Sequence, residues 1–266
     1  MTTLTRQYGF TLVELAIVMT IIGLLIGGIL KGQELIQNAR ATSTIAQIRS
    51  FEAATTTFRD TFSALPGDMQ NASTRLAGCA TNCDPGGSGG NSIIGVVGWS
   101  GTNFVNQQVL PSNGGGGPGA REGVLYWLHL LQANLIGGVS AEAMTATSFQ
   151  LGVTNPAAPI GGGLIVGYAD GTTALPGNAS TAGLHPTGHI IGVVNTLNGG
   201  LTTTAGGQPM SSAKAALIDR KMDDGRPATG FVQAYGVQTS CITDATTLAY
   251  NERVTANDCG LVFRIQ

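Results

Sequence analysis

The stretch Gly9-Phe10-Thr11-Leu12-Val13-Glu14 opens an apolar segment that continues to Leu30. From Phe10 to Leu30 the segment is 21 residues long, and Glu14 is its only charged side chain. At about 1.5 Å per residue, a helix of this length crosses a hydrocarbon core of roughly 30 Å. An ionisable group in such a segment costs roughly 2–4 kcal/mol, so Glu14 is expected to have a specific partner. The sequence therefore predicts a membrane helix with one acidic group near its start.

This motif resembles the cleavage and methylation signature of type IV prepilins and type II secretion pseudopilins. In that family a membrane peptidase cuts after the Gly that ends a short basic leader, and the new N-terminal residue is N-methylated. The resemblance implies a cut between Gly9 and Phe10, methylation of Phe10, and pairing of Glu14 with the N-terminus of an adjacent subunit. It also implies several partners: a prepilin peptidase/N-methyltransferase, an inner-membrane assembly platform, and other pilin-like subunits in a homo- or hetero-polymer.

Two other interpretations of the N-terminus remain open. A secretory signal peptide has an apolar core of about 7–15 residues and a small-residue cleavage site beyond it. This apolar run is longer, and Gly27, Gly28 and Gly32 form no Ala-x-Ala pattern. A signal-anchor helix on an unrelated periplasmic domain agrees with the span length alone. The order of basic leader, Gly, Phe and internal Glu favours the prepilin interpretation over both.

After the apolar segment the sequence turns polar but keeps a helical rhythm. Residues at three- and four-residue steps form one largely apolar stripe: Ile45, Ile48, Phe51, Thr55, Phe58 and Phe62. Leu65-Pro66-Gly67-Asp68 ends the pattern. We therefore expect a leader at 1–9, a transmembrane half-helix at 10–30, an amphipathic half-helix at 31–64 and a globular domain at 65–266. Residues 10–62 would form one helix of about 80 Å.

Two pairs of glycines lie in or next to the predicted span, Gly23 with Gly27 and Gly28 with Gly32. Small residues at this four-residue spacing allow helices to approach closely, as a filament core of bundled helices would require. Glycine is also simply common in membrane helices. We favour the packing interpretation, because two such pairs occur on one short segment.

The remainder of the chain predicts an α+β domain, in which the long helix packs on an antiparallel sheet. Helices are expected at 122–136, ended by Gly137-Gly138, and at 211–221. Short apolar runs between Gly, Pro and Asn predict four strands, at 163–168, 189–194, 230–235 and 261–265. Residues 78–119 are rich in glycine and predict a long loop with some order around Ile93–Val97 and Trp99. No Lys-Ser/Thr follows its glycine runs, which excludes a Walker-type phosphate loop.

Charge and cysteine content constrain the environment of the protein. Only 11% of residues are charged and the net charge is −2, so no basic footprint for nucleic acid is expected. The Lys and Arg residues flanking the span do not fix its orientation. Four cysteines favour an oxidising compartment and allow three pairings. The resemblance to pilins favours Cys241–Cys259, with Cys79–Cys83 as the second local pair. Neither pair has the Cys-x2-Cys spacing typical of zinc.

None of the candidate catalytic or metal-binding residues has the spacing and sequence context that a known enzyme motif requires. His185 and His189 have four-residue spacing, but Pro186 and Gly188 indicate a solvated loop rather than a metal-binding helix. Gly98-Trp99-Ser100-Gly101 lacks the spacing of a nucleophile elbow. Asp223 and Asp224 could contribute to a calcium site of the kind found in some pseudopilins. Adjacent Asp before Gly is more often a turn, so no cofactor and no metal ligand are assigned.

The resemblance implies a structural function. We expect a single-pass protein of the bacterial inner membrane, with its globular domain in the periplasm, that polymerises through its N-terminal helix. Whether the filament is a type IV pilus or a type II secretion pseudopilus, and whether the subunit is major or minor, stays open. The alternative is an adhesin or binding domain displayed on a pilin-like stem. An exposed aromatic or charged patch in residues 78–119 would distinguish it.

Overall fold

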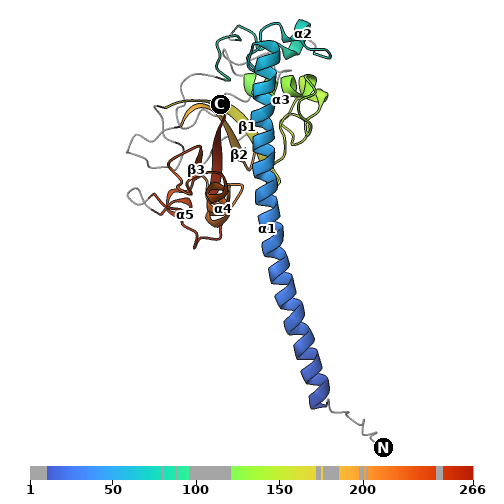
Figure 1. Cartoon of the computed structure of the whole chain (residues 1–266), viewed down its shortest axis with the longest axis vertical. Helices are drawn as coiled ribbons and strands as arrows, with labels where there is room; N and C mark the ends of the chain where they lie inside the picture. Colours follow the sequence, from blue (N-terminus) through green and yellow to red (C-terminus); the bar gives the residue numbers. More distant parts are fainter. Residues whose placement is uncertain are drawn as a thin grey trace, which may run out of the picture. The chain divides into compact units, whose positions relative to one another are not determined.

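The computed structural model describes residues 11–79, 81–87, 89–95, 121–171, 175, 186–197, 201, 203–243 and 248–265. The chain divides into two compact units, Met1–Arg40 and Ala41–Gln266. Helix α1, Leu12–Phe62, contributes residues to both units (Figure 1). It ends where the sequence predicted, at Phe62.

The part of α1 in the second unit buries one face. Its buried residues are Ala41, Thr44, Ile48, Phe51, Ala54, Thr55 and Phe58. This face contains most of the predicted stripe, while Ile45 and Phe62 are half-buried against the same core. Because the spacing follows the helical repeat, the stripe stays on the side of the helix that faces the domain. The opposite face is exposed and carries polar and charged residues such as Arg49, Thr56 and Asp60.

A tight turn follows α1 and has a clear physical basis. Gly67 has φ +86°, and a Cβ there would lie 2.4 Å from the carbonyl oxygen of Glu122, so the position requires glycine. The next residue, Asp68, accepts hydrogen bonds from the backbone N–H groups of Gly90, Asn91 and Ser92 at 2.6, 3.2 and 2.8 Å. The turn therefore anchors the 89–92 segment to the end of α1.

Four antiparallel strands form one sheet in the order β1-β2-β4-β3. Their bounds are β1 Gly163–Asp170, β2 Thr187–Val194, β3 Val232–Gly236 and β4 Cys259–Ile265. All four strands were predicted from their apolar runs, which confirms the α+β fold class. Tyr235 pairs with Gly260 across β3 and β4. A Cβ at Gly260 would lie 2.1 Å from the Tyr235 ring, so the glycine gives this aromatic side chain its space.

Helices α3, Glu122–Gln132, and α4, Ser212–Met222, correspond to the two predicted helices. The expected end of the first at Gly137-Gly138 is wrong. Asn134 adopts the left-handed conformation with φ 57°, and the N–H groups of Asn134 and Leu135 donate to the carbonyls of Leu131 and Leu130. This is a Schellman motif with Asn in place of the usual Gly, and it ends the helix early.

Shorter elements were not predicted. They are α2, Ala72–Arg75; η1, Thr81–Cys83; η4, Ala141–Met144; and α5, Gln238–Cys241. Each is a single turn of three or four residues, which is too short for a periodic apolar pattern to reveal.

The core lies on both faces of the sheet. The larger cluster joins one face to α1, α3 and α4, and includes the edge-to-face contact of Phe51 with Trp127 at 5.0 Å between ring centroids. A smaller cluster covers the opposite face around Ile165, Ile190 and Val262. Burial of both faces explains why the strands are apolar runs rather than alternating patterns.

Candidate functional site

Glu14 is held by the first turn of α1. The hydroxyl oxygen of Thr11 accepts a hydrogen bond from the backbone N–H of Glu14 at 3.2 Å. In return, Oε2 of Glu14 accepts hydrogen bonds from the backbone N–H and the hydroxyl of Thr11, both at 2.9 Å. This reciprocal arrangement is a capping box, which satisfies backbone donors that the helix itself leaves free. Thr11 was not among the predicted site residues, although its Thr-x-x-Glu spacing from Glu14 is typical of this motif.

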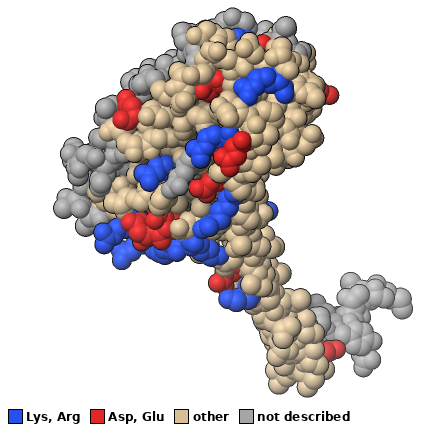
Figure 2. Space-filling view, turned by 45° about the horizontal axis from the view of Figure 1, so that its top comes forward, with Lys and Arg blue, Asp and Glu red and all other residues tan. Residues whose placement is uncertain are grey.

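The N-terminal part of α1 presents an apolar surface. Every residue from Thr11 to Lys31 is exposed, and this part of the helix is almost free of charge in Figure 2. By length and composition α1 is long and apolar enough to cross a membrane. Further along, Lys31 and Glu34 form an exposed ion pair at 2.6 Å, where charged residues return to the helix. The predicted membrane segment therefore corresponds to a helix surface that no other described residue of its unit covers.

The four glycines of the two predicted pairs lie on this same surface. A Cβ placed on Gly23, Gly27, Gly28 or Gly32 would have no atom within 4 Å among the described residues, apart from the neighbouring backbone of the helix itself. Their small size therefore serves no tertiary contact within the described part of the chain. Gly9 and Phe10, the predicted cleavage and methylation residues, lie outside the described residues.

The cysteines of both expected pairs lie at disulfide distance. The Cα atoms of Cys79 and Cys83 are 5.6 Å apart, and those of Cys241 and Cys259 are 5.0 Å apart. The second pair joins the end of α5 to the start of β4. The residues just before these elements also approach, since the Val237 N–H donates to the Asp258 carbonyl at 3.0 Å. This arrangement fits the local pairing that the resemblance to pilins implied.

A third carboxylate joins the two aspartates singled out in the sequence. Oxygens of Asp219, Asp223 and Asp224 lie within 4.8 Å of one another. Two of them bind the turn that follows α4: Asp219 accepts from the N–H of Gly225 and Asp224 from the N–H of Arg226. Asp223 instead accepts from the N–H groups of Phe231 and Val232, at the start of β3. The hydrogen bonds of Asp224 therefore support the turn interpretation. Calcium is also bound by carboxylate oxygens that lie this close together. Asp219 was missed because it lies a helical turn earlier in α4.

The histidines have separate structural settings. His129 is fully buried in α3, accepts a hydrogen bond at Nδ1 from the Gly67 N–H at 2.9 Å, and donates from Nε2 to the Cys83 carbonyl at 2.8 Å. Burial lowers the pKa of His129 to about 4, so the ring is neutral and ties the α1 turn to the η1 segment. His189 lies on β2 and is half-buried, so its assignment to a solvated loop was wrong. His185 lies outside the described residues.

The glycine-rich segment is described only in part. Ile94 is fully buried, so the expected order around residues 93–95 is present. Residues 96–120, including Trp99, lie outside the described residues. The patch that would distinguish a displayed adhesin therefore stays a prediction.

Comparison with known proteins identifies the N-terminal segment. Residues 4–30 match the family model of the prokaryotic N-terminal methylation motif. This motif is the signature of type IV pilins and pseudopilins, and it confirms the resemblance drawn from Gly9–Glu14. No curated protein and no solved structure matches the chain.

Proposed function

We propose that this chain is a structural subunit that is stored in a membrane through residues 10–30 and polymerises through α1. The product is a type IV pilus or a type II secretion pseudopilus filament. One observation carries the proposal: the methylation motif opens a helix whose apolar side chains are all exposed as far as Leu30. Large exposed apolar surfaces are costly in water and mark contact with lipid or with other chains. The same surface could serve both, first in the membrane and then in the filament.

The geometry of Glu14 supports its proposed role in assembly. Both donors of Thr11 bind Oε2, and Oε1 has no hydrogen bond within the described residues. An ionised carboxylate offers about four acceptor positions. Oε1 can therefore accept a hydrogen bond from the N-terminal ammonium of an adjacent subunit while the capping box stays intact. That pairing would neutralise the charge and fix the stagger of neighbouring subunits.

The proposal includes the processing and location that the motif implies. A prepilin peptidase would cut between Gly9 and Phe10, and Phe10 would be methylated. The globular domain would lie in the periplasm of a bacterium, which agrees with two cysteine pairs at disulfide distance. An inner-membrane assembly platform and other pilin-like subunits are the proposed partners, and no cofactor takes part.

The Glu14→Ala variant tests the proposal. It should insert into the membrane at least as well as the parent, because a charge in the apolar segment has been removed. Its yield in sheared filaments should nevertheless fall by about tenfold or more. The N-terminal ammonium of each neighbouring subunit would lose its partner, which costs about 1.4 kcal/mol or more per contact. The measurement is filament yield against total membrane protein, in a strain that lacks the parent gene.

Glu34→Ala is the matched control, since it removes an exposed carboxylate from the same helix. An exposed ion pair contributes about 0–1 kcal/mol, so filament yield should stay near that of the parent. Mass spectrometry of each variant establishes that the leader has been cut after Gly9. Equal filament yield from correctly processed Glu14→Ala would contradict the assembly role and favour a monomeric membrane-anchored domain.

A further inference from the structure

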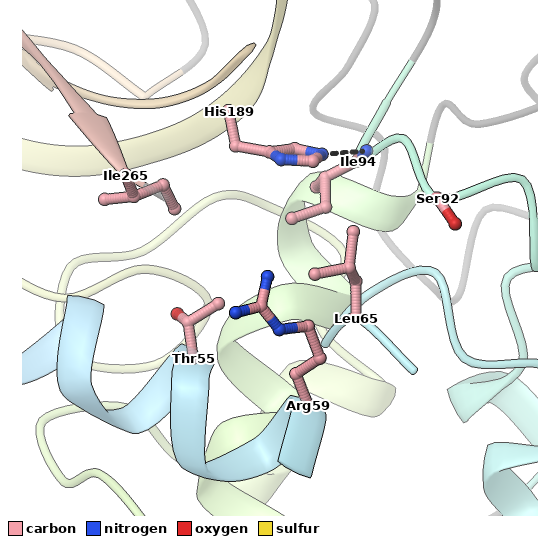
Figure 3. A pocket seen from close by; sticks show the side chains of 7 residues that line it. All are labelled: Thr55, Arg59, Leu65, Ser92, Ile94, His189 and Ile265. Atoms are coloured by element: carbon pink, nitrogen blue, oxygen red, sulfur yellow. Dashed lines mark hydrogen bonds between the residues drawn. The ribbon is translucent and has the colours of Figure 1, made fainter. Parts of the chain in front are cut away.

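A pocket of about 260 Å³ lies between the last turns of α1, the 89–95 segment and the sheet. Figure 3 shows the residues that line it: Thr55, Arg59, Leu65, Ser92, Ile94, His189 and Ile265. All of them belong to the second compact unit. Because Asp68 holds the 90–92 segment through three backbone hydrogen bonds, one wall of the pocket is fixed to the end of α1.

Two of the polar side chains that line the pocket, Arg59 and His189, offer N–H donors. Figure 3 shows the guanidinium of Arg59 directed from α1 toward the ring of His189 on β2. Arg59 makes no side-chain hydrogen bond or ion pair within the described part of the chain. In this respect it differs from Arg220, which pairs with Glu252. The pocket thus contains a guanidinium whose five N–H donors have no acceptor among the described residues.

His189 supplies a second donor. Its Nε2 accepts a hydrogen bond from the Ile94 N–H at 3.3 Å. Burial and the nearby charge of Arg59 lower the pKa of His189 to about 4, so the ring is neutral at neutral pH. A neutral imidazole whose Nε2 accepts must carry its proton on Nδ1. The hydroxyl of Thr55 is already engaged with the Phe51 carbonyl and the Tyr126 hydroxyl.

The other walls are apolar. Ile94 and Ile265 are buried side chains, and Leu65 is half-buried beside them. A ligand must therefore bring an acceptor group for the donors and a short aliphatic part for these walls. One guanidinium matches a singly charged carboxylate, which it can bind through two parallel hydrogen bonds. A phosphate dianion would keep one negative charge without a counter-charge in a partly apolar site.

We propose that this pocket binds a carboxylate that carries a short aliphatic tail, with Arg59 and the Nδ1–H of His189 as donors. The carboxylate belongs either to a free aliphatic acid or to the C-terminus of a peptide. Both sources present the same group to the same donors. The proposal concerns the globular unit and does not depend on polymerisation.

The test uses the full mature chain in detergent micelles with labelled isoleucine methyl groups. Butyrate should shift the methyl signals of Ile94 and Ile265 in a saturable way, while butyramide, its neutral isostere, should not. Arg59→Gln should weaken butyrate binding by about tenfold or more, because it removes a charge-assisted hydrogen bond. Arg49→Gln removes the same charge from the same helix outside the pocket, and should bind like the parent. Arg59→Lys keeps the charge but loses the two parallel N–H donors, so its affinity for butyrate should lie between those of the parent and Arg59→Gln.

The remaining methyl signals show whether each variant is folded. A capped peptide with a free C-terminal carboxylate and the same peptide with an amide end distinguish the two sources. Tighter binding of the free-ended peptide than of butyrate assigns the site to a peptide, and the reverse assigns it to a free acid. Absence of saturable shifts from both carboxylates overturns the proposal. So do equal shifts from butyramide, or unchanged binding by folded Arg59→Gln.

Discussion

Asp219 is a carboxylic acid at a fully buried position of α4, where it accepts a hydrogen bond from the Tyr250 hydroxyl at 2.7 Å. Burial raises the pKa of Asp219 to about 6, and the nearby charges of Asp224 and Asp223 add to the effect. The folded protein therefore binds this proton more tightly than the unfolded chain does. The resulting stability is complete below about pH 4 and is lost as the pH rises through about 6.

We expect the free energy of unfolding to fall between pH 4 and 6 by up to about 3 kcal/mol from this residue alone. His129, whose pKa is lowered, contributes with the opposite sign, because its neutral form is favoured in the fold. The difference between the parent and Asp219→Asn therefore isolates Asp219. Urea unfolding at several pH values should show this difference changing across the window. A difference between the parent and Asp219→Asn that stays the same at every pH would contradict the prediction.

Single residues show which features of the fold a local sequence pattern can predict and which it cannot. Glu14 and the glycine pairs stand out in the sequence because one charge and four missing side chains are conspicuous in or next to an apolar run, and their roles stay predictions. Asn134 was not recognised as a helix end, since its left-handed conformation depends on hydrogen bonds rather than on composition. The partners of His129 lie 62 and 46 residues away in the sequence. No local pattern can reveal contacts at such separations.

At the scale of elements, α1 has two parts with different surfaces: its residues are all exposed up to Lys31, and one face is buried from Ala41 onward. Replacing Gly27 by Leu places a large side chain on a surface where no atom of the described chain lies within 4 Å. The helix itself should become more stable by roughly 0.5–1 kcal/mol, because glycine is a poor helix former. If Gly27 lies at a helix–helix contact of the filament, Gly27→Leu should reduce filament yield severalfold while membrane insertion stays normal. Gly27→Ala should be milder.

Ile29→Leu is the control, because Ile29 is exposed on the same helix and already large. Its filament yield should match that of the parent. Equal yield from Gly27→Leu and Ile29→Leu would show that Gly27 lies away from any close contact. The packing interpretation would then have to rest on Gly23, Gly28 and Gly32.

The Cys241–Cys259 pair links the end of α5 to the start of β4. Cys241 and Cys259 are 18 residues apart in sequence and close the segment between α5 and β4. In the loop-entropy model, this link stabilises the fold by roughly 3 kcal/mol. Non-reducing peptide mapping should find Cys241 joined to Cys259 and Cys79 joined to Cys83. The double variant Cys241→Ala/Cys259→Ala should lose about that amount in urea unfolding, and free thiols in periplasmic material would contradict the pairing.

At the scale of the whole molecule, the four strands were predictable because both faces of the sheet are buried and each strand is a short apolar run. Their order, β1-β2-β4-β3, was not predictable. It depends on β4 inserting between β2 and β3, a long-range pairing that sequence spacing does not encode. The pocket beside Arg59 could not be predicted from the sequence for the same reason. Its residues come from α1, the turn after it, the 89–95 loop and two strands, most of which are distant in sequence.

The core of the second unit begins at Ala41, and no buried side chain precedes it among the described residues. We therefore expect a chain of residues 41–266, exported behind a secretory signal, to fold without the N-terminal part of α1. It should be soluble, contain both disulfides and unfold cooperatively in urea, as monitored by the fluorescence of buried Trp127. It should be absent from filaments, because it lacks Glu14 and the apolar surface.

A chain of residues 49–266 is the matched control, because it removes three buried residues, Ala41, Thr44 and Ile48. Loss of Thr44 also leaves the Ile160 N–H without the hydroxyl that accepts from it at 3.1 Å. Removing Ile48 alone should cost about 2 kcal/mol or more, so the shorter chain should unfold at a clearly lower urea concentration. If residues 41–266 aggregate or unfold without cooperativity, then the fold itself requires the membrane half of α1. That result would contradict the prediction that the part of α1 before Ala41 is not needed for folding.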